Sequence, residues 1–194
     1  MAKGHAKGSS FERAICKELS LWWTDGKRDD IFWRTAGSGA RATVRRGRNC
    51  ATANSAGDIC ALHFSGQPFI DRFIVELKKG YSREIDVLKM VDAAPGRKPC
   101  VLQQWLEKAW REVKENNRDE AWLIFQRDRA KPMLAMRDGF LRELEDGMCL
   151  SYPYPSIRVQ TEVEFWCFVV LREFLGWYNP SQVVLMGKGR RRKC

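Results

Sequence analysis

The sequence predicts an α/β protein in which helices flank a mixed β-sheet and a helical extension follows at the C-terminus. Short runs rich in β-branched and aromatic residues predict the strands, and longer runs with helical apolar spacing predict the helices. The length of 194 residues fits one domain of ordinary size with a small appendage. We expect a core over residues 1–147. Residues 148–194 would add a strand, an apolar helix and a basic tail packed on that core.

An amphipathic helix is predicted near the N-terminus. Ser9 or Ser10 can act as its N-cap, and Asp25-Gly26 is a stop signal. A short strand follows at residues 31–34. The apolar face of the helix is expected to consist of residues at helical spacing, namely Phe11, Ile15, Leu19 and Trp22.

Residues 59–64 and 73–77 form the pair of predicted strands that carries most of the chemistry. Residues 65–68 between them are typical of a turn, which predicts an antiparallel hairpin. With the turn centred on residue 67 or 68, Asp58 lies opposite Glu76 or Lys78. Because side chains alternate between the faces of a strand, Glu76 and Lys78 share one face. Two carboxylates and an ammonium group are therefore expected to converge.

Such a convergence suits phosphodiester hydrolysis. Two neighbouring acidic ligands are what Mg²⁺ requires, and a nearby lysine can orient or deprotonate the attacking water or stabilise phosphate charge. Glu76 interrupts an apolar strand, where an uncompensated carboxylate is costly. The same pattern also arises by chance in a chain with 30% charged residues, as Glu112 and Lys114 illustrate. A purely structural role for these charges stays open.

Helices and strands alternate in the second half of the predicted fold. In the helix over residues 101–116, an apolar stripe faces the core, and Lys108, Arg111 and Glu112 are expected to face water. Thr161 begins a capping box that predicts an apolar helix up to Gly176, which would pack on the sheet or form a homodimer interface. The other elements expected are a short helix at 82–91, strands at 121–126, 133–137 and 157–160, and a helical turn at 141–146.

The charge of the chain predicts a polyanionic partner. A net charge of +10 favours nucleic acid, with an anionic membrane surface as the second possibility. The glycines around Ser38 allow backbone amides to approach a phosphate, although a solvated mobile loop is the alternative. The arginines expected to bind DNA are Arg34, Arg41, Arg45, Arg46, Arg48, Arg190, Arg191 and Arg192.

The numbers and spacing of cysteine and histidine residues limit the kinds of site that the chain can form. Seven scattered cysteines without a Cys-x-x-Cys pair predict reduced thiols rather than a disulfide framework or a zinc site. With only His5 and His63, histidine-based catalysis is nearly excluded. The N-terminus has no apolar segment typical of a signal peptide, and the longest apolar run is too short to span a bilayer. We therefore expect a cytoplasmic protein with no membrane partner.

The order of these features resembles the PD-(D/E)XK nuclease superfamily, and within it most closely the archaeal-type Holliday junction resolvases. The resemblance spans residues 8–137 and implies a restriction-endonuclease-like fold and a Mg²⁺-dependent DNA endonuclease, in which Mn²⁺ can substitute. An Arg-rich segment at 40–56 and the C-terminal extension depart from a compact resolvase. The matching motifs are GSSFER, RTAGSG, GDI and VELK.

The resemblance also implies roles for individual residues. Asp58 and Glu76 would hold the metal, and Glu12 would add a third acidic group there. Lys78 would act on the water or the transition state, and Ser38 would assist at the scissile phosphate. Arg34 would contact a phosphate. A resolvase would act on branched DNA as a homodimer and leave a 5′-phosphate.

Two other functions remain open from the sequence. The chain could be a restriction-type or replication and repair nuclease of the same fold, which differs only in its substrate. It could also be a non-catalytic basic nucleic-acid-binding protein whose acidic residues are structural. The second alternative predicts steep salt dependence of binding but no metal requirement.

Overall fold

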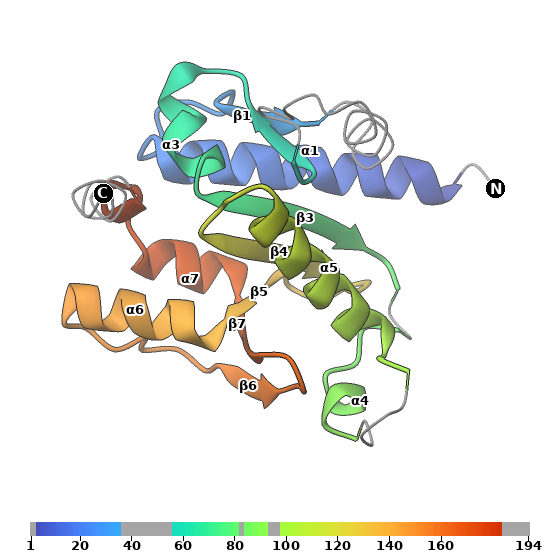
Figure 1. Cartoon of the computed structure of the whole chain (residues 1–194). Coiled ribbons are helices and arrows are strands. Elements are labelled where there is room, and N and C mark those ends of the chain that lie inside the picture. Colours follow the sequence, from blue (N-terminus) through green and yellow to red (C-terminus); the bar gives the residue numbers. More distant parts are fainter. Residues whose placement is uncertain (1–2, 36–55, 82–83, 93–97, 184–194) are drawn as a thin grey trace.

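A mixed sheet runs through the middle of the molecule in the computed structural model, which describes residues 3–35, 56–81, 84–92 and 98–183 (Figure 1). Within these residues the sheet has five strands in the order β3-β4-β5-β7-β6. β3 and β4 are parallel, and the other neighbours are antiparallel. The strands are β3 (Phe73–Lys79), β4 (Glu120–Gln126), β5 (Met133–Arg137), β6 (Ile157–Gln160) and β7 (Phe165–Val170).

A separate antiparallel pair of short strands, β1 (Phe32–Arg34) and β2 (Ile59–Ala61), lies beside β3. A 3-10 turn, η1 (Phe64–Gly66), follows β2. The described helices are α1 (Lys3–Trp23), α3 (Gln67–Ile70), α4 (Leu88–Val91), α5 (Val101–Glu115), α6 (Asp138–Met148) and α7 (Leu171–Trp177). The α/β restriction-endonuclease-like fold expected from the sequence is confirmed.

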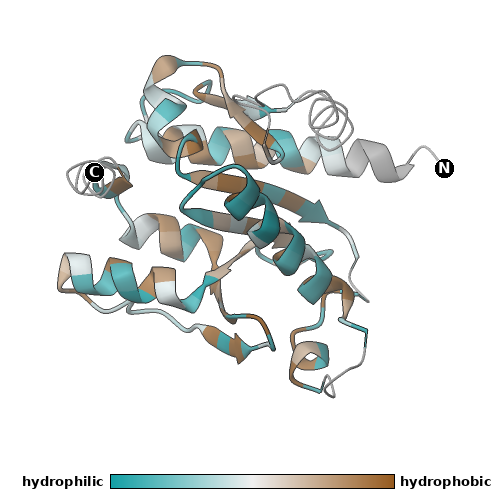
Figure 2. Ribbon diagram, in the orientation of Figure 1, coloured by the Kyte–Doolittle hydropathy of each residue, from teal (hydrophilic) through white to brown (hydrophobic). Residues whose placement is uncertain are grey.

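The alternation of side chains along β3 separates the two helical layers. Val75 and Leu77 belong to the main core, which also contains the apolar face of α1. Ile74 points to the opposite face, where it packs with Ala109 and Val113 of α5. The side of α5 turned away from the sheet is largely hydrophilic (Figure 2). Glu76 and Lys78, which alternate with Leu77, therefore face the α5 layer.

The structure contradicts the predicted hairpin. β2 and β3 form no ladder with each other, because β2 pairs with β1 and β3 pairs with β4. The segment expected to be a turn forms η1 and the start of α3. Pro68 lies in the first turn of that helix, where its missing N–H costs nothing. Gly66 packs so tightly that a Cβ atom would lie 2.7 Å from Ile31.

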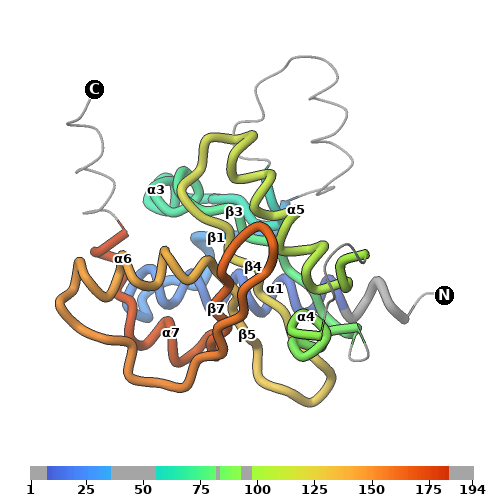
Figure 3. The backbone as a smooth tube through the Cα atoms, turned by 60° about the horizontal axis from the view of Figure 1, so that its bottom comes forward, coloured from blue at the N-terminus to red at the C-terminus, as the bar shows by residue number. Residues whose placement is uncertain are grey.

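The apolar helix predicted from the Thr161 capping box is wrong over its first half. Residues 165–170 form β7, which pairs with β5 on one side and β6 on the other. An apolar run of six residues fits a strand covered on both faces as well as it fits a helix. The helix begins only at Leu171. β7 lies next to β5 in the centre of the molecule (Figure 3), so most of this segment is not a surface for a second copy.

The remaining differences concern the ends of elements. α1 begins at Lys3, ahead of the predicted caps Ser9 and Ser10, and it ends close to the predicted stop. The short helix expected at 82–91 is described only as α4, whereas the helical turn at 141–146 is part of the longer α6. The division into a nuclease core and an extension at residue 147 stays a prediction. No helix in the described part of the chain is both long and apolar enough to cross a bilayer.

Candidate active site

Gly57 brings Asp58 against the free edge of β3. Its φ of +78° lies in the left-handed region that glycine adopts readily, and a Cβ atom would lie 2.7 Å from the carbonyl oxygen of Val75. Because the backbone comes this close to β3, the N–H of Asp58 donates a hydrogen bond to Val75 O at 2.7 Å. The carboxylate of Asp58 also accepts the N–H of Leu77 at 2.8 Å. A glycine and two hydrogen bonds to the backbone of β3 thus fix the position of Asp58.

The three residues expected to converge do so, although no hairpin joins them. Lys78 Nζ lies 2.8 Å from Glu76 Oε2 and 3.8 Å from Asp58 Oδ2. Both carboxylates are largely buried, with side-chain exposures of 7% for Glu76 and 11% for Asp58. The ammonium group therefore bridges two buried acids that come from separate segments of the chain.

Burial dominates the electrostatics of this cluster. It raises the pKa of Glu76, and the neighbouring Asp58 carboxylate raises it further. The positive charges of Lys78 and Lys108 oppose that rise. Burial alone would lower the pKa of Lys78, but Glu76 and Asp58 outweigh it, and the net pKa is above the ordinary value. The buried Glu76 carboxylate is thus costly to keep ionised unless a cation stays close.

Lys108 also belongs to the cluster, although the sequence predicted that its side chain would face water. It projects from α5, and its Nζ lies 3.7 Å from Glu76 Oε2 and 3.4 Å from Glu112 Oε1. About half of its side chain is exposed. The only sequence signal for this contact is that helical spacing places Lys108 one residue before the buried Ala109, at the border of the apolar stripe.

Glu12 is held by an ion pair outside the cluster. It comes from α1, and its carboxylate pairs with Arg34 Nη1 at 3.4 Å, while the same guanidinium also donates to Ser9. Burial raises the pKa of Cys16 to about 12, and the charges of Glu12 and Asp58 contribute to this shift. The metal-binding role expected for Glu12 and the phosphate contact expected for Arg34 stay predictions.

Several predicted site residues lie outside the described residues. These are the loop residue expected to assist at the scissile phosphate and most of the arginines expected to bind DNA, namely Ser38, Arg41, Arg45, Arg46, Arg48, Arg190, Arg191 and Arg192.

The cluster fits a hard divalent cation. Two carboxylates lie within reach of one positive group, and the ammonium of Lys78 occupies the kind of position that a cation would favour. Within the described residues no group of three or more His, Cys, Asp or Glu side chains is placed to hold a metal. Mg²⁺ is commonly bound by one or two carboxylates, with water and phosphate oxygens in the remaining positions. Asp58 and Glu76 match that donor set.

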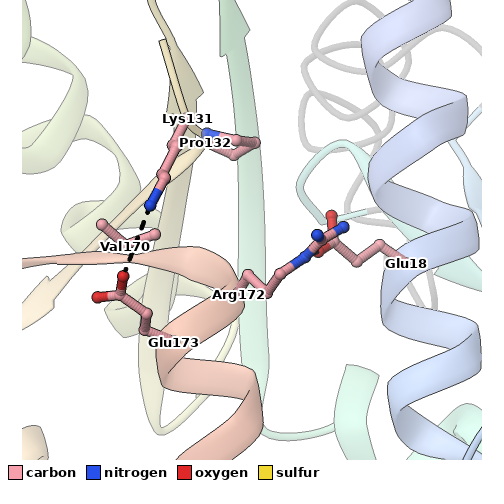
Figure 4. Close-up of a pocket in the computed structure, with 6 residues that line it drawn as sticks. All are labelled: Glu18, Lys131, Pro132, Val170, Arg172 and Glu173. Carbon is pink, nitrogen blue, oxygen red and sulfur yellow. Dashed lines mark ion pairs between the residues drawn. The ribbon is translucent and has the colours of Figure 1, made fainter. Parts of the chain in front are cut away.

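A cavity of about 330 Å³ elsewhere in the molecule offers no comparable chemistry. Its charged side chains pair across it: Lys131 with Glu173 at 3.8 Å, and Arg172 with Glu18 at 3.6 Å (Figure 4). None of the residues predicted for the site lines it. The carboxylate cluster at β3 is therefore the better candidate for an active site.

Comparison with known proteins places the chain in a protein family. The protein family described as "Phage putative PDDEXK endonuclease" matches residues 3–184, nearly the whole chain. A search of curated proteins found no match, and a search of solved structures found none either. Asp58, Glu76 and Lys78 lie within the matched residues. The chain belongs to this family of PDDEXK endonucleases.

Proposed function

We propose that the protein is a Mg²⁺-dependent DNA endonuclease that hydrolyses phosphodiester bonds, with Mn²⁺ able to substitute. The observation that carries the proposal is the bridging of Asp58 and Glu76 by the ammonium of Lys78. A buried carboxylate with a raised pKa, such as that of Glu76, is typical of sites that bind cations or perform catalysis. The net charge of +10 supports a nucleic acid as the partner.

In this proposal the chain supplies both ligands and positive charge. Asp58 and Glu76 hold the cation, and the hydrogen bond from Leu77 N–H keeps the Asp58 carboxylate aimed at the site. A bound Mg²⁺ would polarise a phosphate oxygen and favour ionisation of a water molecule. Lys78 holds its ammonium beside both acids, where it can orient the attacking water or stabilise negative charge on the phosphate.

The proposed substrate is DNA, including branched DNA such as a four-way junction, and the proposed assembly is a homodimer. The order of motifs from Glu12 to Lys78 supports this finer assignment, because it resembles that of junction resolvases. Ser38 and the arginines of the loop and tail would contact the DNA backbone, which positions a nucleic acid without reading its sequence. A restriction-type or repair nuclease of the same fold would differ in the DNA shape it prefers.

The test compares four-way junctions, flaps and linear duplexes of matched sequence in Mg²⁺, Mn²⁺ and EDTA. We expect cleavage in both metals, none in EDTA, and a preference for the junction. If all three substrates were cleaved at the same rate, the proposed nuclease activity would stand and the proposed preference for junctions would be rejected. Cleavage that survives EDTA would reject the metal mechanism.

One observation favours a second candidate, a non-catalytic nucleic-acid-binding protein. Each carboxylate of the cluster already has a lysine partner, so the charges are also balanced as a structural network. That candidate predicts DNA binding with steep salt dependence and no cleaved product in any metal.

A further inference from the structure

Lys108 is held between two carboxylates from different elements. Its ammonium lies 3.7 Å from Glu76 on β3 and 3.4 Å from Glu112 one helical turn further along α5. With Glu76 almost completely buried and about half of the Lys108 side chain exposed, the ammonium lies at the boundary between the site and solvent. A group in this position can reach a molecule that approaches the carboxylates from outside.

The charge balance of the cluster changes when a cation binds. Asp58 and Glu76 carry two negative charges, which Lys78 and Lys108 balance in the structure. With Glu112 counted, a divalent cation held by the same carboxylates would change the cluster from one net negative to one net positive charge and weaken the attraction that holds both lysines. Because Lys108 is the more exposed of the two, its ammonium has the shorter path to a phosphate in solvent.

We propose that Lys108 is a DNA-phosphate contact of the active site, which exchanges its ion pair with Glu76 for a phosphate oxygen next to the scissile bond. This inference rests on the proposed function for the identity of the substrate. It assigns Lys108 a role in holding DNA and leaves the metal to Asp58 and Glu76. Glu112 keeps the lysine at the mouth of the site in both states, because their ion pair lies within α5.

Glu76→Gln allows a test without metal or cleavage. The substitution removes the negative charge that attracts Lys108, as a bound cation would, so Lys108 is released towards DNA in EDTA. DNA binding is measured by fluorescence anisotropy from 50 to 200 mM salt in a cycle of Glu76→Gln, Lys108→Met and the double variant. Lys114→Met is the matched control, because Lys114 lies on the same helix over the Trp110 ring, 5.2 Å from its centroid, and is not paired with Glu76.

We expect Glu76→Gln to bind DNA more tightly than the wild type. Adding Lys108→Met to it should lower the slope of log K against log salt by about 0.9, the value for one phosphate contact. Adding Lys114→Met should leave the slope unchanged, and Lys108→Arg should retain it because the charge is kept. Thermal melts of each variant check the fold.

Equal slopes for the Lys108→Met and Lys114→Met double variants would overturn the inference. The inference would also be overturned if Lys108→Met weakened DNA binding to an equal degree with and without Glu76→Gln. Lys108 would then not exchange Glu76 for a phosphate. Failure of the proposed function would look different. The wild-type protein would bind DNA and not cut it in Mg²⁺, while the binding cycle would still report on Lys108.

Discussion

The carboxylate of Asp58 accepts the backbone N–H of Leu77, the residue that lies between Glu76 and Lys78 in β3. This 2.8 Å hydrogen bond, together with the one from Asp58 N–H to Val75 O, links the segment after Gly57 to the strand that carries the other two site residues. The geometry of the candidate site therefore depends on a backbone contact as well as on charge. Substitutions at Asp58 can separate the two contributions.

Asp58→Asn is expected to fold normally and to lose cleavage. The amide oxygen can still accept the Leu77 N–H, whereas the negative charge needed for a cation is gone. We expect the cleavage rate to fall on the order of 100-fold or more, the scale seen when one electrostatic group of an active site is removed. Asp58→Ala should in addition destabilise the fold by about 1–3 kcal/mol, because a buried N–H loses its partner. Urea unfolding and plasmid cleavage of both variants provide the comparison, and equal stability of the two would contradict it.

Gly57→Ala is expected to disturb both stability and the site. The new Cβ would lie 2.7 Å from Val75 O at a positive φ, so the Asp58 segment must move away from β3. A loss of about 1–3 kcal/mol is expected from strain of this kind, together with reduced cleavage. Gly147→Ala in α6 is the control, because nothing lies within 4 Å of its added Cβ, and it should be neutral or slightly stabilising. Comparable stability losses in the two variants would show that the tight approach of Gly57 is unimportant.

Glu120 is expected to make stability depend on pH. Burial raises its pKa to about 7, against the attraction of Arg137, whose Nε lies 2.8 Å away. Because the folded state binds this proton more tightly than the unfolded state, the resulting stability is complete below pH 4.5 and is lost as the pH rises through about 7. The shift corresponds to roughly 3 kcal/mol.

Urea unfolding of wild type and Glu120→Gln at pH 5 and pH 8 measures this effect. The wild type should lose stability relative to the variant between the two pH values, since glutamine does not titrate. Parallel pH profiles of the two proteins would mean that Glu120 has an ordinary pKa.

Removal of residues 148–194 is expected to abolish folding. The deletion would take away β7, which pairs with β5 over five residues, along with β6 and α7. A chain that ends at residue 183 keeps all the described elements and serves as the control. Circular dichroism and size-exclusion chromatography should find the shorter chain unfolded or aggregated and the longer one folded. A folded, active chain of 147 residues would instead support an independent core.

The sequence predicted the fold class, and it predicted that Glu76 and Lys78 share a face because alternation along β3 is a local property. The convergence with Asp58 was inferred from a hairpin that does not form, and Asp58 instead reaches β3 through backbone contacts with Val75 and Leu77. The connection between β2 and β3 was predicted wrongly, because the Ser-Gly-Gln-Pro segment suits a hairpin turn and a helix start equally. In the structure it forms η1 and the start of α3, with Gly66 packed against Ile31. β7 was misjudged for a similar reason, since an apolar run reads as a strand only when its neighbours β5 and β6 are known. Lys108 was missed because helical spacing does not reveal which strand residue lies beneath α5.

The most direct test of the central claim is the rate at which Glu76→Gln cleaves supercoiled plasmid in Mg²⁺, relative to the wild type. Glutamine keeps the size of the buried side chain and removes the charge that a cation and two lysines share. If Asp58 and Glu76 hold the metal, the variant melts like the wild type and cleaves at least about 100-fold more slowly. Cleavage by the folded variant at the parental rate would contradict the account.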